Sequence, residues 1–316
     1  MVNLRKIAEN FNMLPGFTGT VKLDEPMNLH TSFKIGGPAA VFVEPDTPES
    51  LQVVCKTLEK ENIPFFIIGA GSNLVVSDGG LDCFVISTQK ISFIEQREYT
   101  ETESKEDSVL LHCGAGVSMD VASKWCAERG LSGLEAFAGL PGTTGGALFM
   151  NARCYGVSVS DVLASATYLD CSTGYDLKRY DFSAEGWDYK KSPFQDSSKV
   201  IVSADFVVKK GNASEIAAEC EEHLTDRDKK GHFSYPSAGS VFKNNRSFGK
   251  PSGQIIDEAG LRGVQIGGAQ IAPWHGNFII NTGSATAEDV RQLVDYVISV
   301  VKSKTGFTLE SEIIFV

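Results

Sequence analysis

The stretch AGLPGTTGGA, residues 138–147, contains four glycines, one proline and two threonines in ten positions. Its glycines, single proline and two threonines let it turn tightly, with several backbone N–H groups and two hydroxyls directed into one concavity. Thr143 or Thr144 can cap a short helix that begins near Gly145, which would add the positive end of a helix dipole. The stretch therefore predicts a site for a phosphate group.

A second glycine loop, Gly69-Ala70-Gly71-Ser72-Asn73, follows the apolar run at 64–68. The preceding chain predicts a strand at 39–43 and a helix capped by Thr47, so the loop ends a β-α-β unit. It continues into a β-like segment at Leu74 instead of opening a helix, which excludes the usual nicotinamide-binding fingerprint. Either loop alone is most simply a tight turn, but two such loops at strand ends favour a bound pyrophosphate.

Length and composition are typical of a globular protein of two or three domains. The chain has 316 residues, 42% of them hydrophobic and 22% charged, and a net charge of -11 argues against a partner of duplex nucleic acid. The seven cysteines are scattered without a CxxC pair, which is typical of reduced thiols, and no metal site is expected. No signal peptide and no apolar run of about 20 residues is present, so we expect a cytoplasmic protein with no membrane partner.

The C-terminal third carries a constrained serine and two carboxylates. Ser240 follows Tyr235-Pro236-Ser237-Ala238-Gly239, where a serine most simply satisfies turn backbone, and no GxSxG elbow is present. Thr286 and Asp289 form a predicted capping box for a long helix with a core-facing apolar stripe. We expect the chain to end in a strand over 309–316 that directs Glu310 and Glu312 to the same face.

Five stretches, in this order, together resemble the UDP-N-acetylenolpyruvoylglucosamine reductase family. They are Gly69–Asn73, Gly133–Ala152, Tyr235–Phe242, His275–Phe278 and Leu309–Glu312. The resemblance implies noncovalent FAD, NADPH as the reductant and a UDP-sugar enolpyruvate as the substrate, which is reduced to UDP-N-acetylmuramate for peptidoglycan. The chain is similar to the shorter subtype, which lacks an extra substrate-covering insertion.

The resemblance also implies the architecture. We expect an α+β protein whose FAD-binding part, residues 1–210, has two α+β subdomains that meet near residue 62. This part would have the FAD-binding fold of vanillyl-alcohol oxidase and the CO-dehydrogenase flavoprotein. Residues 211–316 would form an α+β substrate domain, whose last strand returns to the active site. The oligomeric state stays open, with a monomer favoured.

Site residues follow from the same resemblance, position by position. Ser240 matches the proton donor, Glu312 the C-terminal catalytic carboxylate, and Lys190 the arginine of a Tyr-Arg-x-Ser motif. The expected FAD-binding residues are Gly69, Ala70, Gly71, Ser72, Asn73, Leu74, Gly139, Pro141, Gly142, Thr143, Thr144, Gly145 and Gly146. The expected substrate-binding residues are Tyr189, Arg227, Lys230, Asn244 and His275.

Three departures from the family pattern keep alternatives open. Lys190 retains the charge of arginine but not its planar fork, Arg153 replaces a glycine, and Lys230-Gly231-His232 replaces Lys-Gln-Pro. A flavin-binding homologue with weakened or altered activity is therefore one alternative. A flavin oxidase of the related superfamily is another, which oxygen consumption with an alcohol substrate would distinguish.

Overall fold

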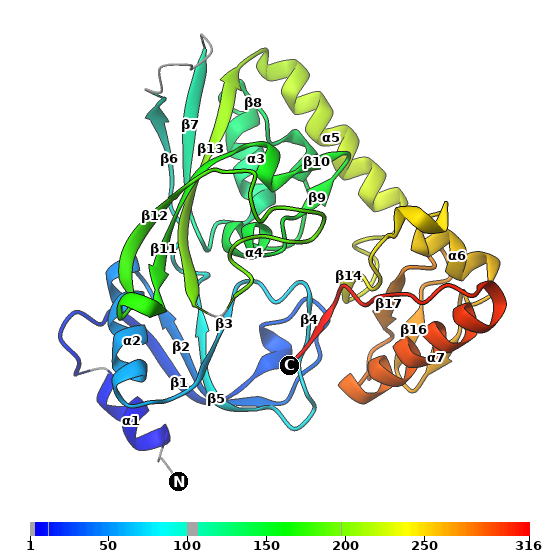
Figure 1. The fold of residues 1–316 in the computed structure, drawn as a ribbon, viewed down its shortest axis with the longest axis horizontal. Helices are drawn as coiled ribbons and strands as arrows, with labels where there is room; N and C mark the ends of the chain where they lie inside the picture. The colour runs from blue at the N-terminus through cyan, green and yellow to red at the C-terminus, as the bar shows by residue number, and fades with distance from the viewer. Residues whose placement is uncertain (1–3, 12, 100–106, 197) are drawn as a thin grey trace. The chain divides into compact units, whose positions relative to one another are not determined.

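The computed structural model describes residues 4–11, 13–99, 107–196 and 198–316. The chain, whose course is coloured from the N-terminus to the C-terminus in Figure 1, divides into two compact units, each assembled from three separate segments. The first unit comprises Met1–Leu23, Val41–Ala70 and Cys83–Thr225. The second comprises Asp24–Ala40, Gly71–Asp82 and Asp226–Val316.

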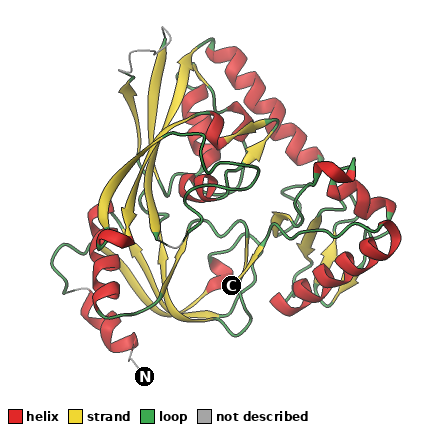
Figure 2. Ribbon diagram, viewed as in Figure 1, coloured by secondary structure: helices red, strands yellow, loops and turns green. Residues whose placement is uncertain are grey.

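The largest sheet of the first unit is six-stranded and antiparallel, in the order β12-β11-β13-β7-β6 with β8 added beside β13. Its strands are β6 (Ile94–Glu98), β7 (Ser108–Gly114), β8 (Leu131–Ser132), β11 (Leu163–Asp170), β12 (Asp176–Asp181) and β13 (Lys199–Lys210). The helices beside it are α3 (Met119–Ala127), α4 (Thr144–Phe149) and α5 (Ala213–Lys229), as Figure 2 shows. Because α4 packs on β13 and β7, the glycine stretch lies against this sheet. A small antiparallel pair joins β9 (Arg153–Cys154) to β10 (Val157–Ser158).

A second sheet has the order β1-β2-β5-β3, in which β3 and β5 run parallel. Its strands are β1 (Gly19–Pro26), β2 (Pro38–Pro45), β3 (Phe65–Ile68) and β5 (Leu81–Ser87), and α1 (Leu4–Phe11) and α2 (Pro48–Lys60) complete this region. Thr47 caps α2 as predicted, because its side chain accepts a hydrogen bond from Ser50 N. Side chains of α2 such as Leu51 and Leu58 share a buried core with Val43 and Phe84 of the sheet.

The second unit contains a four-stranded sheet in the order β14-β17-β16-β15. Its elements are β14 (Ser237–Ser240), α6 (Ser252–Glu258), β15 (Gln265–Ile266), β16 (Ala269–Ile271), β17 (Phe278–Asn281) and α7 (Ala287–Thr305). The predicted capping box of Thr286 and Asp289 is confirmed at the start of α7. One core joins Phe33, Val75 and Ile313, so residues from all three chain segments hold this unit together.

The chain end differs from the long strand expected over 309–316. Only β18 (Ile314–Phe315) is a strand, and it pairs in parallel with β4 (Leu74–Val75). The preceding residues turn to another partner, because Lys243 N donates to Glu310 O at 2.9 Å. The terminal segment therefore changes partners midway, and no single ladder extends over it.

Short 3-10 turns complete the chain: η1 (Met27–Leu29), η2 (Glu135–Phe137), η3 (Val159–Asp161), η4 (Cys171–Thr173) and η5 (Arg246–Phe248). All seven cysteines carry free thiols, as predicted. Within the part of the chain that the structure describes, the helices are too short or too polar to be membrane spans.

Candidate active site

The glycine stretch opens α4, and Thr143 is the residue that caps it. Thr143 Oγ1 accepts a hydrogen bond from Gly146 N at 3.3 Å. Thr144 faces the other way, because its hydroxyl donates to Val117 O at 3.1 Å and its amide to the same oxygen at 2.7 Å. Of the two threonines that the sequence left open, the structure thus identifies Thr143 as the cap.

The two glycine loops meet at Gly69 and Thr143. A methyl group on Gly69 would lie 2.4 Å from Thr143 Oγ1, which is closer than such atoms approach, so position 69 has no space for a side chain. Gly69 directly follows β3, and its carbonyl accepts a hydrogen bond from Gln89 Nε2 at 3.1 Å. The fold of the first unit therefore brings together two loops that are far apart in sequence.

The chemistry of these loops fits the diphosphate of FAD. Neither Gly69–Asn73 nor residues 138–147 contain an acidic side chain. Glycine backbone, hydroxyls and the N-terminus of a helix are the groups that bind phosphate oxygens in many nucleotide sites. The absence of a side chain at Gly69 lets the Thr143 side chain, which caps the helix, pack directly against this loop.

The segments that carry Ser240 and Glu312 are neighbours in the second unit. Glu312 N donates to Val241 O at 2.7 Å, and Ser311 forms a bridge with Phe242. Val241 directly follows Ser240, so this pairing brings the predicted proton donor and the predicted carboxylate to adjacent backbone segments.

The latter half of the first glycine loop is joined to the same chain end. Asn73 Nδ2 donates to Glu312 O at 3.1 Å, and Asn73 O accepts from Ile314 N at 3.0 Å. Leu74 pairs with Ile314 in the parallel β4–β18 ladder. Two expected FAD-binding residues therefore hold the backbone on which Glu312 lies.

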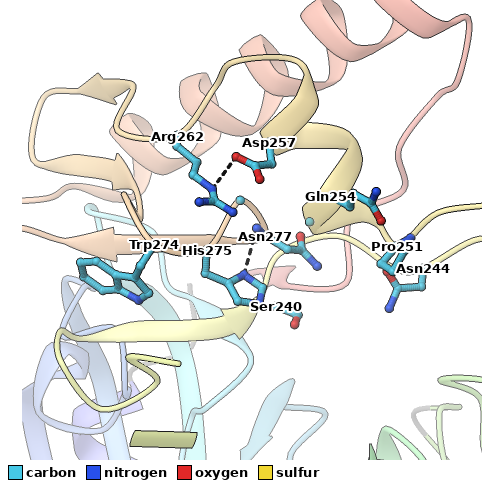
Figure 3. A pocket seen from close by; sticks show the side chains of 11 residues that line it. Ser240, Asn244, Pro251, Gln254, Asp257, Arg262, Trp274, His275 and Asn277 are labelled. Carbon is cyan, nitrogen blue, oxygen red and sulfur yellow. Dashed lines mark hydrogen bonds and ion pairs between the residues drawn. The ribbon is translucent and has the colours of Figure 1, made fainter. Parts of the chain in front are cut away.

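A polar pocket of about 470 Å³ opens in the second unit beside Ser240 (Figure 3). Its lining includes Ser240, Asn244, Gln254, Arg262, Trp274 and His275. Ser240, Asn244 and His275 are thus brought together as predicted site residues, whereas Glu312, Arg227 and Lys230 are not among the described residues that line this pocket. Arg262 Nε pairs with Asp257 Oδ1 at 2.5 Å, so that guanidinium is already partly neutralised.

Asn277 fixes the strand that ends at Ser240. Its side-chain amide donates to Phe242 O at 2.8 Å, and its side-chain oxygen accepts from Phe242 N at 2.9 Å. Its backbone N–H donates to His275 Nδ1 at 3.2 Å, as the dashed line in Figure 3 shows. One buried asparagine therefore orients both the serine segment and the imidazole.

Two histidines of the second unit are held in the neutral form. Burial, with the charges of Arg227, His275 and Lys230, lowers the pKa of His232 to about 4. Burial also lowers the pKa of His275 below its usual value, and the charges of Arg262 and Lys230 act in the same direction. Because Asn277 N donates to His275 Nδ1, the ring proton of His275 lies on Nε2.

Lys190 lies at the tip of a tight turn in the first unit. Lys191 N donates to Asp188 O at 3.0 Å and closes the turn. Lys190 has a φ of 58°, a left-handed backbone that a lysine adopts at an energetic cost. The ammonium lies 5.8 Å from the ring centroid of Tyr189.

Neighbouring side chains hold this turn in place. Asn151, which follows α4, donates from Nδ2 to Asp188 O at 3.0 Å. Gln195 Nε2 donates to Lys190 O at 2.9 Å, and Ser192 Oγ donates to Phe149 O at 2.8 Å. The turn with Lys190 is therefore anchored to the end of the helix that the glycine stretch opens.

The remaining predicted cations have several environments. Arg153 is exposed, and its guanidinium donates to Ser158 Oγ at 3.0 Å. Arg227 is buried, whereas Lys230 forms an ion pair with Asp226 at 2.6 Å. Arg153 belongs to the first unit and the other two to the second.

Several pocket residues were missed by the sequence reasoning. Gln254, Asp257 and Arg262 come from α6 and the turn after it, where no motif stood out. Trp274 and Asn277 lie within two residues of the predicted His275, so the motif around this histidine could have indicated both of them as pocket residues.

Comparison with known families divides the chain into two matching regions. Residues 39–175 match the model of an FAD binding domain. Residues 231–316 match the model of the C-terminal domain of UDP-N-acetylenolpyruvoylglucosamine reductase. The first region contains both glycine loops, and the second contains the pocket and the chain end.

Individual relatives extend this similarity over the whole chain. The UDP-N-acetylenolpyruvoylglucosamine reductase of Treponema denticola is 46% identical over 100% of this chain and 98% of its own length. The enzyme of the same name from Treponema pallidum is 39% identical over 92% of each chain. The crystal structure of the Thermus caldophilus enzyme superposes with a TM-score of 0.74 at 29% identity, covering 95% of this chain and 99% of that one.

These relatives match the chain almost end to end, which favours the reductase over a flavin-binding homologue with weakened activity. The predicted α+β fold, with an FAD-binding region followed by a reductase C-terminal domain, is confirmed. The chain belongs to the family of UDP-N-acetylenolpyruvoylglucosamine reductases, and it is an FAD-dependent oxidoreductase.

Proposed function

We propose that Ser240, Glu312 and Lys190 are the catalytic residues for the reduction of the enolpyruvyl ether of UDP-N-acetylglucosamine to UDP-N-acetylmuramate. When bound, FAD supplies to the β-carbon of the enolpyruvyl group a hydride taken from NADPH. That addition leaves negative charge on the α-carbon and its carboxylate. The protein must then stabilise the charge and deliver one proton to the α-carbon.

Ser240 is the proposed source of this proton. Ser240 lines a pocket of about 470 Å³, which is within the usual range for small-molecule sites, and the acceptor carbon is basic enough to take a proton from an alcohol. A carboxylic acid at Glu312 would hydrogen-bond the developing charge. The observation that carries this proposal is the 2.7 Å hydrogen bond from Glu312 N to Val241 O, which supports joint action of the two residues.

Lys190 is the proposed cation for the substrate carboxylate. An ammonium attracts a carboxylate as a point charge but cannot form the two parallel hydrogen bonds of a guanidinium. The left-handed turn and its anchors to Asn151 and Gln195 support a fixed direction for the side chain. Asn244, His275, Lys230, Arg227 and Tyr189 are proposed to contact the rest of the substrate.

Separate measurement of the two half-reactions tests the role of Ser240. Ser240→Ala should accept hydride from NADPH at close to the wild-type rate, because no α-carbon is protonated in that step. Its reoxidation by the enolpyruvyl substrate should be about 10²–10⁴-fold slower, as is usual when a positioned proton donor is removed. Stopped-flow absorbance of the flavin follows both steps.

Ser237→Ala is the matched control, since Ser237 lies on the same strand, β14, and outside the pocket lining. It should leave both half-reactions near wild type. Equal impairment of both half-reactions in Ser240→Ala would instead mean that the serine shapes the flavin site.

We also propose a cytoplasmic, monomeric protein that binds neither nucleic acid nor membrane. The seven free cysteines support the cytoplasmic location, and the net charge of -11 supports the absence of a nucleic-acid partner. The division into an FAD-binding part at 1–210 and a substrate domain at 211–316 is likewise proposed, with the family matches at 39–175 and 231–316 in its support.

A further inference from the structure

The strand that ends at Ser240 contains one residue more than the stretch of its partner that it faces. Ser237 of β14 lies opposite Ile280 of β17. Ser240 lies opposite Phe278, so three steps along β14 correspond to two steps along β17. Such an extra residue is a β-bulge, which changes the direction of the side chains that follow it and is frequent next to active sites.

The bulge decides which way Ser240 faces. Side chains of a regular strand alternate, so Ala238 and Ser240, two residues apart, would share one face of the sheet. Ala238 is buried in the core of the second unit, whereas Ser240 lines the pocket (Figure 3). The extra residue therefore turns Ser240 away from the core and towards the pocket.

Gly239 gives the bulge its backbone conformation. Its φ is 74°, in the left-handed region that a residue with a side chain adopts at an energetic cost. Apart from its chain neighbours, no described residue has an atom within 4 Å of a methyl group placed on Gly239. A glycine is therefore needed here for its backbone conformation, and not because the surrounding chain leaves no space.

The backbone on both sides of the bulge is fixed by segments that are distant in sequence. Before the bulge, Ser32 Oγ donates to Ser237 O at 2.7 Å. After the bulge, Val241 N donates to Asn277 O at 2.9 Å. Ser32 is itself joined to the first glycine loop, because its N–H donates to Gly71 O at 3.4 Å. The strand therefore has little freedom to accommodate a different conformation at the bulge.

We propose that Gly239 is a positioning residue for Ser240. Its left-handed backbone forms the bulge that directs the serine hydroxyl into the pocket, and Ser32 holds the strand before the bulge. This inference rests on the proposed function, because it takes Ser240 to be the proton donor. A residue at position 239 that disfavours the left-handed region should therefore slow only the step in which Ser240 delivers its proton.

Two substitutions of Gly239 separate backbone conformation from space. Gly239→Ala adds only a methyl group but disfavours the left-handed region, whereas Gly239→Asn adds a larger side chain that tolerates this region better. In stopped flow, reoxidation of the reduced flavin by the enolpyruvyl substrate should be about 5- to 30-fold slower in Gly239→Ala. Gly239→Asn should stay within about threefold of wild type. Reduction of the flavin by NADPH should be close to wild type in both variants.

Gly306→Ala is the matched control. Gly306 follows α7 with a φ of 77°, and no described residue beyond its neighbours comes within 4 Å of an added methyl group. Urea unfolding should show a similar loss of stability in Gly239→Ala and Gly306→Ala, but Gly306→Ala should keep both half-reactions near wild type. Ser32→Ala removes the donor to Ser237 O and should slow reoxidation about 2- to 10-fold.

Reoxidation of Gly239→Ala at the wild-type rate would overturn the proposal. A slower rate in Gly239→Asn than in Gly239→Ala would also overturn it, because the reaction would then need the open space and not the backbone conformation. Wild-type kinetics of Ser32→Ala would overturn the role of Ser32. Normal reoxidation of Ser240→Ala would overturn the proposed function itself, whereas slow Ser240→Ala together with normal Gly239→Ala would overturn this inference alone.

Discussion

Replacement of Gly69 by alanine should disrupt the contact between the two glycine loops. The added methyl would lie 2.4 Å from Thr143 Oγ1. Thr143 is only 3% exposed and cannot rotate freely into solvent. Either its side chain leaves the position in which it accepts from Gly146 N, or the backbone of one loop shifts.

The loss of stability in Gly69→Ala can be estimated from these two structural responses. Loss of a threonine N-cap costs about 0.5–2 kcal/mol, and overpacking of a well-filled site costs about 1–3 kcal/mol. We therefore expect Gly69→Ala to lower the free energy of unfolding by about 2–3 kcal/mol. Thr143→Ala alone loses only the cap and should cost about 1 kcal/mol.

The double variant distinguishes a steric clash from general damage. When Thr143 is alanine, the closest of its atoms to the new methyl is Cβ at 3.5 Å, an ordinary contact. Gly69→Ala/Thr143→Ala should therefore be about as stable as Thr143→Ala, which gives a coupling energy of about -2 to -3 kcal/mol. Urea unfolding of the three variants and wild type measures this value.

FAD titration of the same proteins reports on the proposed site. Gly69→Ala should weaken FAD binding about tenfold or more, since about 1.4 kcal/mol corresponds to each factor of ten in Kd. Gly79→Ala is the matched control, because the nearest atom to its added methyl is Ser77 Oγ at 3.7 Å. If the effects of Gly69→Ala and Thr143→Ala on the free energy of unfolding add to within about 0.5 kcal/mol in the double variant, the proposed clash between the two residues is refuted.

Three shorter predictions concern the cation, a buried histidine and the cofactor. Lys190→Ala should lose turnover with the enolpyruvyl substrate while its flavin is still reduced by NADPH, and Lys190→Arg should match or exceed the wild-type turnover. Stopped-flow kinetics measure both steps. Normal turnover of Lys190→Ala would show that Lys190 takes no part in the reaction and would make Arg153 the candidate cation. The pKa of His232 is lowered from 6.5 to about 4, so as pH falls the unfolded chain binds the proton before the folded protein does. The stability that comes from keeping His232 neutral is therefore fully present above pH 6.5 and is lost as pH falls towards 4. From pH 7 to pH 5 the free energy of unfolding should fall by about 1–2 kcal/mol because of His232, after allowance for its partial exposure. If His232→Asn shows the same pH dependence of unfolding as wild type, this prediction is wrong. Acid precipitation should release the flavin into the supernatant, whereas flavin that stays with the pellet would disprove noncovalent binding.

Elements specified by neighbouring residues could be predicted from the sequence. The capping box of Thr286 and Asp289, the cap of α2 by Thr47 and the turn-forming nature of residues 138–147 all depend on residues within a few positions of each other. Caps, turns and apolar periodicity act over one or two turns of backbone, so they can be read without knowing the rest of the fold. The resemblance also grouped Ser240, Asn244 and His275 as expected site residues, and these three residues line one pocket.

Contacts between distant segments depended on the tertiary structure. The apolar pattern of residues 309–316 indicates a strand, but only the packed chain shows that the backbone of Glu312 pairs with Val241 while Ile314 pairs with Leu74. The position of Trp274 against Gly231 could not be anticipated, because no periodic pattern links a turn glycine to a loop tryptophan. Local elements and their chemical groups can be predicted from neighbouring residues, since they depend on short-range sterics and hydrogen bonding. Which groups meet depends on the packed fold, because burial of the shared cores joins segments that have no local interaction with one another.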